Sequence, residues 1–214
     1  MRKLDLPLAF LVVVETVSTA VGDDTSHQVR AELSGYNEVH FAGGPPAALR
    51  GGISTAARGS FKATIDETNQ AIHYERSYQG LEGAVTQAHI HFGQSSTVGG
   101  IVVWLCETAG TPAPSPTSMP VSHPVDLGGL TPECPQEAPP DNPVTGTIGP
   151  DQVLAQTAQG IALFEFAELV RAIRAGATYA NVHSALHPPG EIRGQIHGGL
   201  TGKILDSLGQ KLGD

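Results

Sequence analysis

The sequence predicts a mainly β protein: an antiparallel, Greek-key-like β-sandwich or barrel with one short helix and a long proline-rich loop. Three observations lead to this fold class. Several short segments alternate apolar and polar residues, as half-buried strands do. The 214 residues include 26 glycines and 16 prolines, which favours many turns. A segment late in the chain has the apolar spacing of a helix.

Length and charge limit the architecture and the partners. A chain of 214 residues is long enough for one domain with a sizeable core, which we expect over residues 21–200. The net charge is -9, from 12 Lys and Arg against 21 Asp and Glu. Such a chain lacks the basic surface that binds phosphate backbones or anionic lipid. We therefore expect no nucleic-acid partner.

The first 20 residues have the pattern of a signal peptide. Met1-Arg2-Lys3 supplies positive charge, residues 6–14 are an apolar run, and Ser18-Thr19-Ala20 has the small-x-small pattern of a cleavage site. The alternative is an uncleaved anchor, but the apolar run is shorter than the ~20 residues that span a bilayer. We expect a secreted or periplasmic protein that has no membrane contact after cleavage.

The first strands follow directly from alternation. Residues 28–34 and residues 60–66 each alternate polar and apolar side chains. Residues 67–70 have the composition of a hairpin turn, and they lead into residues 71–78, which alternate again. We expect these last two strands to form an antiparallel pair.

The central part of the chain contains two further strands. Residues 87–93 place His89 and His91 two positions apart, so a strand directs both imidazoles to the same face. Residues 101–106 form an unbroken apolar run that includes Trp104, as expected for a strand buried on both faces.

The remaining elements surround a proline-rich insertion. Residues 108–142 contain too many prolines for regular structure, and strand character resumes at residues 144–148. Residues 164–176 predict a helix that ends at a glycine. The apolar positions of this helix are Phe166, Leu169, Val170 and Ile173. Two closing strands follow, and we interpret residues 201–214 as a C-terminal tail.

The cysteines, Cys106 and Cys134, bracket most of the proline-rich insertion. In an exported chain such a pair predicts a disulfide. Closing a loop of roughly 28 residues stabilises the fold by about 3–4 kcal/mol in the chain-entropy model. The alternative is that both cysteines bind a metal, but the chain lacks the close spacing that zinc sites usually show.

Histidines form the candidate metal site. If the strand that carries His183 lies beside the strand that carries His89 and His91, three imidazoles converge, and His187 or His40 would complete the set. Imidazole ligands suit Cu(II), whereas Zn(II) requires a fourth, tetrahedral partner. We therefore predict copper, with zinc as the less favoured alternative. The competing interpretation is that the pair faces solvent or belongs to a polar network.

Arg193 has two interpretations. It forms a structural ion pair with Glu191 or Asp66 at a strand end, or its guanidinium is directed at an anion beside the metal. The sequence has no Gly-x-Ser-x-Gly elbow, no carboxylate pair suited to acid and base catalysis, and no phosphate-binding loop. We therefore do not predict a hydrolase.

Four segments resemble the chordin-type (CHRD) domain, namely residues 31–39, 88–93, 175–184 and 189–196. The similarity covers roughly residues 28 to 198. Its most specific part is the Tyr-x-Asn-Val-His motif, which is followed by Gly-Glu-Ile-Arg-Gly-Gln. The resemblance implies an extracellular or periplasmic β-rich domain, and for most members it implies little about activity.

A weaker resemblance is to copper-zinc superoxide dismutase. His89-Ile90-His91-Phe92-Gly93, the later Val182-His183 and the arginine after a glycine turn are similar to its copper half and occur in the same order, but the zinc-binding loop is absent. This resemblance implies copper without zinc, a copper-only dismutase-like activity on superoxide or another small anion, and a catalytic role for Arg193. The alternative is a non-enzymatic extracellular module that contacts another protein and holds no metal.

Overall fold

The computed structural model describes residues 28–39, 41–42, 48–49, 51–108 and 131–198. The predicted signal peptide, the C-terminal tail, His40 and most of the proline-rich insertion lie outside these residues. No helix in the described ranges has the length and apolar character needed to cross a membrane.

Strands make up most of the regular structure. They are β1 (Gln28–Ser34), β2 (Phe41–Ala42), β3 (Ala48–Leu49), β4 (Arg58–Asp66), β5 (Ala71–Gln79), β6 (Val85–Phe92), β7 (Gly100–Glu107), β8 (Val144–Ile148), β9 (Thr178–Ser184), β10 (Ile192–Gln195) and β11 (His197–Gly198). The helical elements are η2 (Gly35–Asn37), η3 (Pro150–Gln152), η4 (Thr157–Gln159) and α1 (Phe166–Arg174). The sequence prediction of a mainly β fold with one short helix is confirmed.

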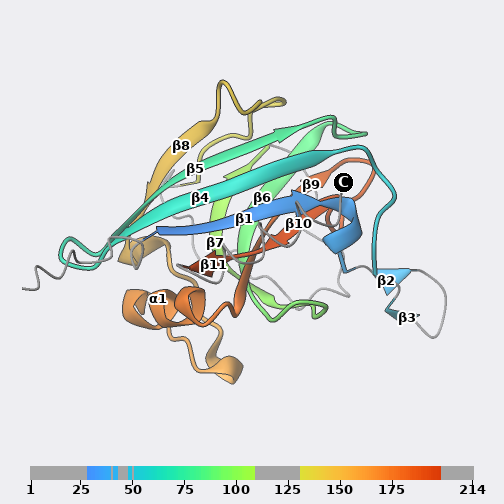
Figure 1. Ribbon diagram of the computed structural model, residues 1–214. Coiled ribbons are helices and arrows are strands. Elements are labelled where there is room, and N and C mark those ends of the chain that lie inside the picture. The colour runs from blue at the N-terminus through green and yellow to red at the C-terminus, as the bar shows by residue number, and fades with distance from the viewer. Residues whose placement is uncertain (1–27, 40, 43–47, 50, 109–130, 199–214) are drawn as a thin grey trace, which may run out of the picture.

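The main sheet is antiparallel and curves into a nearly closed barrel (Figure 1). Its strand order is β7-β6-β9-β10-β1-β4-β5-β8, and β11 also pairs with β1. The pairs β6–β9, β1–β10 and β5–β8 join strands that are distant in the sequence, as in Greek-key folds. The strands β2 and β3 form a separate two-stranded sheet.

Alternation along the strands builds the barrel core. In β4, Phe61, Ala63 and Ile65 point inward and are buried, whereas the residues between them are exposed. The predicted turn at residues 67–70 joins β4 to β5, and the ring of Phe61 stacks on that of Tyr74 at 5.8 Å. The apolar inward side chains of both strands belong to one cluster, and β5 also places the charged Arg76 among the buried residues.

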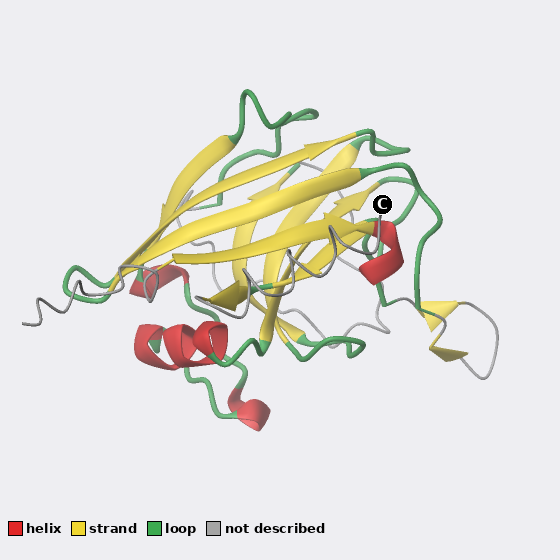
Figure 2. Cartoon of the chain, in the orientation of Figure 1, coloured by secondary structure: helices red, strands yellow, loops and turns green. Residues whose placement is uncertain are grey.

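The helix α1 packs beside one end of the barrel (Figure 2). The four apolar residues that predicted it are all buried, and they join the barrel core. The helix ends just before Gly176, which adopts the positive φ of 65° that favours glycine.

The disulfide between Cys106 and Cys134 is confirmed, with the two Cα atoms 4.9 Å apart. It ties the later part of the proline-rich insertion to β7. The interior of β7 is buried on both faces, as its unbroken apolar sequence predicted. On one face Ile101 and Trp104 pack with Leu154 outside the main core cluster.

Candidate metal centre

The pairing of β6 with β9 brings three histidines to one face. Residues that lie opposite each other in an antiparallel pair share a face of the sheet. His89 lies opposite Asn181, and His183 lies opposite Gln87, two positions from His89. His91 lies opposite Tyr179 on the same face. The strand of His183 therefore pairs with the strand of His89 and His91, as predicted, and the three imidazoles are neighbours on one face.

The face that carries these histidines points away from the barrel interior. The alternating residues of the same strands, Ala88, Ile90, Ala180 and Val182, belong to the barrel core. The histidines are nevertheless buried, with exposed fractions of 0% for His89, 8% for His91 and 3% for His183. Loop residues contact two of them, Gly99 at His91 and Pro188 at His183, and Trp104 of β7 packs against His89.

The ring nitrogens are close enough for one ion. One nitrogen from each of the three rings lies within 4.8 Å of the others. His89 Nδ1 is 3.2 Å from His183 Nε2, a separation that subtends about 100° for metal–nitrogen bonds of about 2.0–2.1 Å. This angle falls within the range that copper and zinc accept.

Backbone carbonyls determine the tautomers of two rings. His91 Nδ1 is 2.9 Å from the Gly99 carbonyl, and His183 Nδ1 is 2.7 Å from the Pro188 carbonyl. Because a carbonyl only accepts, each Nδ1 must carry the hydrogen, so each neutral ring has its lone pair at Nε2. The Nε2 atoms of His91 and His89 are buried without a hydrogen-bond partner among the described residues.

Burial keeps the three rings neutral. Desolvation lowers the pKa of His91 to about 3 and that of His183 to about 4. It also lowers the pKa of His89 well below its ordinary value, and the neighbouring His183 lowers it further. A neutral imidazole is the form that binds metal, so protons compete little for these nitrogens near neutral pH.

Aromatic side chains hold two of the rings in place. The Trp104 ring stands edge to face against His89, with centroids 4.2 Å apart, and Tyr179 stacks on His91 at 4.7 Å. The Tyr179 hydroxyl accepts a hydrogen bond of 3.1 Å from the Gly99 N–H, and Gly99 in turn orients His91. Tyr179 therefore positions His91 twice, through its ring and through its hydroxyl.

Arg193 is buried on the far side of Tyr179. Its guanidinium carbon lies 3.3 Å from the centroid of the Tyr179 ring, on which the His91 ring also stacks. The guanidinium and the imidazole are both too close to the ring to occupy the same face of it. Tyr179 therefore separates Arg193 from His91. The guanidinium donates to the carbonyls of Thr97 at 2.7 Å and Gln94 at 3.0 Å. These bonds fasten the β6–β7 loop over the histidines.

The carboxylates considered as partners of Arg193 make other contacts. Glu191 accepts hydrogen bonds from Thr55 and from the Glu82 backbone, and Asp66 accepts from Asn69. A different carboxylate, Glu38, interacts electrostatically with Arg193, but burial is the larger effect and raises the pKa of Glu38 to about 7.

Comparison with known families identifies the domain. Residues 29–196 match the family model of the CHRD domain, which is more than half of the chain. The protein belongs to the CHRD domain family. Neither the curated proteins nor the solved structures contain a match to it. The similarity to copper-zinc superoxide dismutase rests on the sequence motifs alone.

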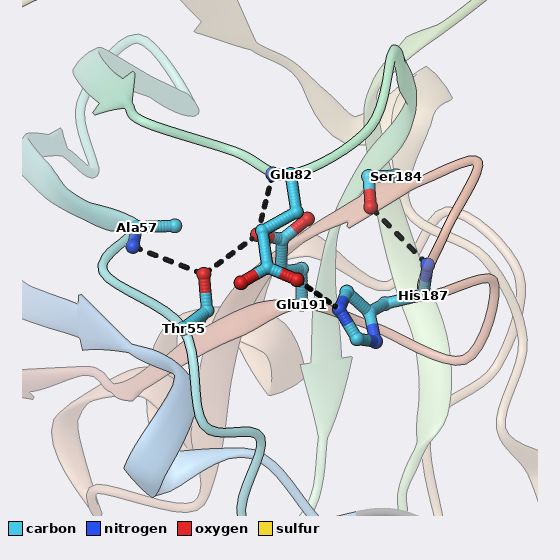
Figure 3. Close-up of polar contacts among 6 residues, drawn as sticks. All are labelled: Thr55, Ala57, Glu82, Ser184, His187 and Glu191. Carbon is cyan, nitrogen blue, oxygen red and sulfur yellow. Dashed lines mark hydrogen bonds and ion pairs between the residues drawn. The ribbon is translucent and has the colours of Figure 1, made fainter.

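In this CHRD domain, His187 lies apart from the three-histidine group. Its Nε2 is 3.2 Å from a carboxylate oxygen of Glu82, and together with Glu191 these residues form a second group whose ligand atoms lie within 4.8 Å of one another (Figure 3). The structure therefore unites His89, His91 and His183, as predicted, and assigns His187 to a different cluster.

Four residues of these sites in the CHRD domain were not predicted from the sequence to belong to them: Tyr179, Glu38, Glu82 and Glu191. One signal was present, in the glycine of the Gly-Glu-Ile-Arg motif. Gly190 has a φ of 134°, and a Cβ at this position would come within 2.5 Å of Glu38 Oε2. A glycine in such a loop indicates a close approach between distant segments, although it does not identify the partner.

Proposed function

We propose that this CHRD domain is an exported copper-binding protein in which His89 Nδ1, His91 Nε2 and His183 Nε2 bind the ion. One observation carries the proposal: three buried, neutral imidazoles converge, and backbone carbonyls leave the Nε2 lone pairs of two of them free to bind. Buried polar groups normally have partners, so a buried Nε2 without one calls for an explanation, which a bound metal supplies.

Copper suits this set better than zinc. Imidazole-rich sites bind Cu(II) more tightly than Zn(II) in the general order of divalent-ion affinities. Structural zinc sites use four protein ligands, and among the described residues no fourth His, Cys, Asp or Glu belongs to this group. Three imidazoles alone are compatible with the T-shaped or tetragonal coordination of copper.

Export is supported by the family and by the disulfide. The signal-peptide pattern and the similarity to an extracellular domain family both favour it. Disulfides persist mainly in oxidising compartments, so the bond between Cys106 and Cys134 is consistent with a secreted or periplasmic location.

Dismutation of superoxide is the further activity that we propose to test. Bound copper would supply the Cu(II)/Cu(I) couple: one superoxide is oxidised to O₂, and a second takes up that electron and two protons to give H₂O₂. Arg193 and Gln195 line a groove of about 690 Å³ together with Ser95 and Ser96, which makes Arg193 a candidate guide for an anion, although the three histidines do not line this groove. Its separation from His91 by Tyr179 limits that role to the electrostatic field.

A copper titration of the metal-free protein tests the proposal. We expect one Cu(II) per chain with submicromolar affinity, an electron paramagnetic resonance spectrum with nitrogen couplings, and weaker binding of Zn(II). His91→Ala should abolish this site. The exposed His73, which bonds to Thr147, provides the matched control, so His73→Ala should bind copper as the wild type does. Single-site binding that survives His91→Ala would contradict the assignment.

The same preparation tests the activity. The copper-loaded protein should dismutate superoxide faster than an equal concentration of free copper and faster than the His91→Ala protein. Tight copper binding without this excess rate would leave copper carriage or storage as the function.

The second candidate function is a non-enzymatic protein-interaction module. One observation favours it: the 3.2 Å contact between His89 Nδ1 and His183 Nε2 is also an acceptable hydrogen bond without any metal. Absence of tight copper binding in the titration would remove the copper proposal and leave this interpretation standing.

A further inference from the structure

A second group of metal-ligand side chains includes two residues of the loop that follows β9. Glu82 comes from the turn between β5 and β6, and His187 and Glu191 come from the β9–β10 loop. Figure 3 shows the two carboxylates and the imidazole facing one another. The residues are distant in the sequence, and only the pairing of the barrel strands brings them together.

Glu191 is built into this group rather than exposed to solvent. Its exposed fraction is 0%, and its Oε1 accepts hydrogen bonds of 2.9 Å from Thr55 Oγ1 and from the Glu82 N–H. Its Oε2 is buried and has no hydrogen-bond partner among the described residues. A buried carboxylate oxygen without a partner is destabilising, because its hydration is lost without compensation.

The charges of the group favour a divalent cation. Two carboxylates face one imidazole, and even a protonated His187 would leave the group with excess negative charge. The side chains of Glu82 and His187 remain 40% and 20% exposed, so an ion can enter from solvent. Carboxylate oxygens combined with an imidazole nitrogen are typical of Zn²⁺, whereas Ca²⁺ and Mg²⁺ prefer oxygen ligands throughout. This group offers three ligands, and because it is open to solvent, unlike the buried three-histidine group, water can supply the fourth position of a zinc ion.

The loop that carries His187 also orients His183. The Pro188 carbonyl accepts the His183 Nδ1 hydrogen at 2.7 Å, and the His187 N–H donates to Ser184 Oγ at 3.2 Å. An ion bound between Glu82 and the two loop residues would fix the ends of the segment that contains Pro188. Fixing that segment would in turn fix the carbonyl that sets the tautomer of His183.

We propose that Glu82, His187 and Glu191 form a Zn²⁺ site that fastens the β9–β10 loop and thereby orients His183. This site is separate from the three-histidine group, and its existence does not depend on copper binding there.

Zinc titration in a protein that lacks the imidazole site tests the proposal. His91→Gln removes one ligand of the three-histidine group, so that this group no longer competes for Zn²⁺. The Zn²⁺ that this variant still binds should then depend on Glu82. Adding Glu82→Gln to this background should weaken Zn²⁺ binding by about 10- to 100-fold or more, since loss of a second-shell partner alone has an effect of this size. Adding Glu75→Gln, an exposed glutamate of β5, should leave it unchanged.

Two results would overturn the proposal. One is the absence of Zn²⁺ binding in folded His91→Gln protein, and the other is equal Zn²⁺ affinity with and without Glu82. If His91→Gln fails to fold, cobalt substitution in the wild type replaces it. His187→Gln should then change the Co²⁺ absorption spectrum, whereas His73→Gln should leave the wild-type spectrum intact. A wild-type spectrum in the His187→Gln protein would overturn the proposal.

Copper affinity gives an independent measure of the coupling. In wild-type protein, prior addition of one equivalent of Zn²⁺ should tighten Cu(II) binding by about tenfold, the lower end of a second-shell effect. That gain should vanish in Glu82→Gln and persist in Glu75→Gln. Zinc binding that depends on Glu82, found together with no copper binding, would refute the copper function alone. Copper binding without any such zinc site would refute this inference alone.

Discussion

The two faces of β6 and β9 are equally buried but chemically opposite. The inward face is apolar and includes Ile90 and Val182 within the barrel core. The outward face carries His89, His91 and His183, and covering loops exclude solvent from it. Neighbouring residues of one strand are similarly buried but differ in chemistry. The exposed fraction of a side chain therefore does not by itself distinguish a core residue from a candidate metal ligand.

This difference indicates separate roles for the two faces in stability and in ligand binding. An apolar face stabilises the fold through area removed from water. The histidine face buries polar atoms, some without hydrogen-bond partners, which is unfavourable in the metal-free protein. We therefore expect the inward face to determine stability and the outward face to determine ligand binding. The following predictions test that division in order of decreasing effect on stability.

The largest effect is expected from Ile90→Ala on the inward face. Removing a fully buried isoleucine side chain should lower the free energy of unfolding by about 2–5 kcal/mol. Urea unfolding of the metal-free protein measures this loss. Copper affinity of the folded variant should remain within a few-fold of the wild type. A large loss of affinity with little loss of stability would reverse the roles of the two faces.

Glu38→Gln should stabilise the protein. Burial raises the pKa of Glu38 to about 7, so the folded state loses stability as the pH rises from 4.5, the ordinary value, through about 7. The uncharged amide avoids this penalty, and we expect a gain of about 1–3 kcal/mol at pH 8. Urea unfolding at pH 8 and at pH 5 checks it, because the gain should shrink at the lower pH. A loss of stability at pH 8 would show that the charge is needed beside Arg193.

Acid should destabilise the metal-free protein through the outward face. The ordinary imidazole pKa is 6.5, whereas burial lowers the folded-state pKa to about 3 for His91 and about 4 for His183. The unfolded chain therefore binds more protons. The contribution of the neutral imidazoles to the free energy of unfolding is fully present above pH 6.5. It falls as the pH drops toward 4, by about 1.4 kcal/mol per pH unit for each imidazole.

Unfolding measured between pH 7 and pH 5 should reveal this slope, and His91→Gln should reduce it by the share of one imidazole. Glu38 acts in the opposite direction over part of this range, so the comparison is best made in the Glu38→Gln background. An unchanged slope in His91→Gln would contradict the burial of a neutral ring at this position.

The smallest effect on stability is expected from Tyr179→Phe. The variant keeps the ring that stacks on His91 and removes only the hydroxyl that accepts from Gly99, so the loss should be about 0.5–1.5 kcal/mol. Copper affinity should nevertheless fall by about tenfold or more, because Gly99 orients His91. Calorimetric titration checks the affinity. An unaffected affinity would mean that ring stacking alone positions His91.

Local patterns predicted much of this molecule. Residues 28–34 and 144–148 form strands with the predicted bounds, and the helix lies within the predicted segment. The disulfide followed from cysteine count and context. The convergence of His89 and His91 with His183 was predicted from strand character and from the assumption that the two strands are neighbours. The strand and helix inferences used side-chain periodicity, which depends only on backbone geometry.

Other features had no local signal. The sequence gives no indication that Tyr179 stands between His91 and Arg193, or that Arg193 binds the carbonyls of Gln94 and Thr97. His187 was predicted, as an alternative to His40, to complete the copper set because it supplies a further imidazole. A loop can direct a side chain four residues from His183 into a different cluster, and here it directs His187 toward Glu82.

The sequence by itself determined the strand pattern, the helix, the disulfide pairing and the type of ligand available, because each depends on local geometry or composition. Only the tertiary structure decided which face of β6 and β9 points outward, which loops cover it, and which carbonyls set the imidazole tautomers. These features depend on the β6–β9 pairing across some ninety residues of chain, shown by the 94-residue separation of His89 and His183. The register of that pairing is set by the packing of the whole barrel and not by either strand alone.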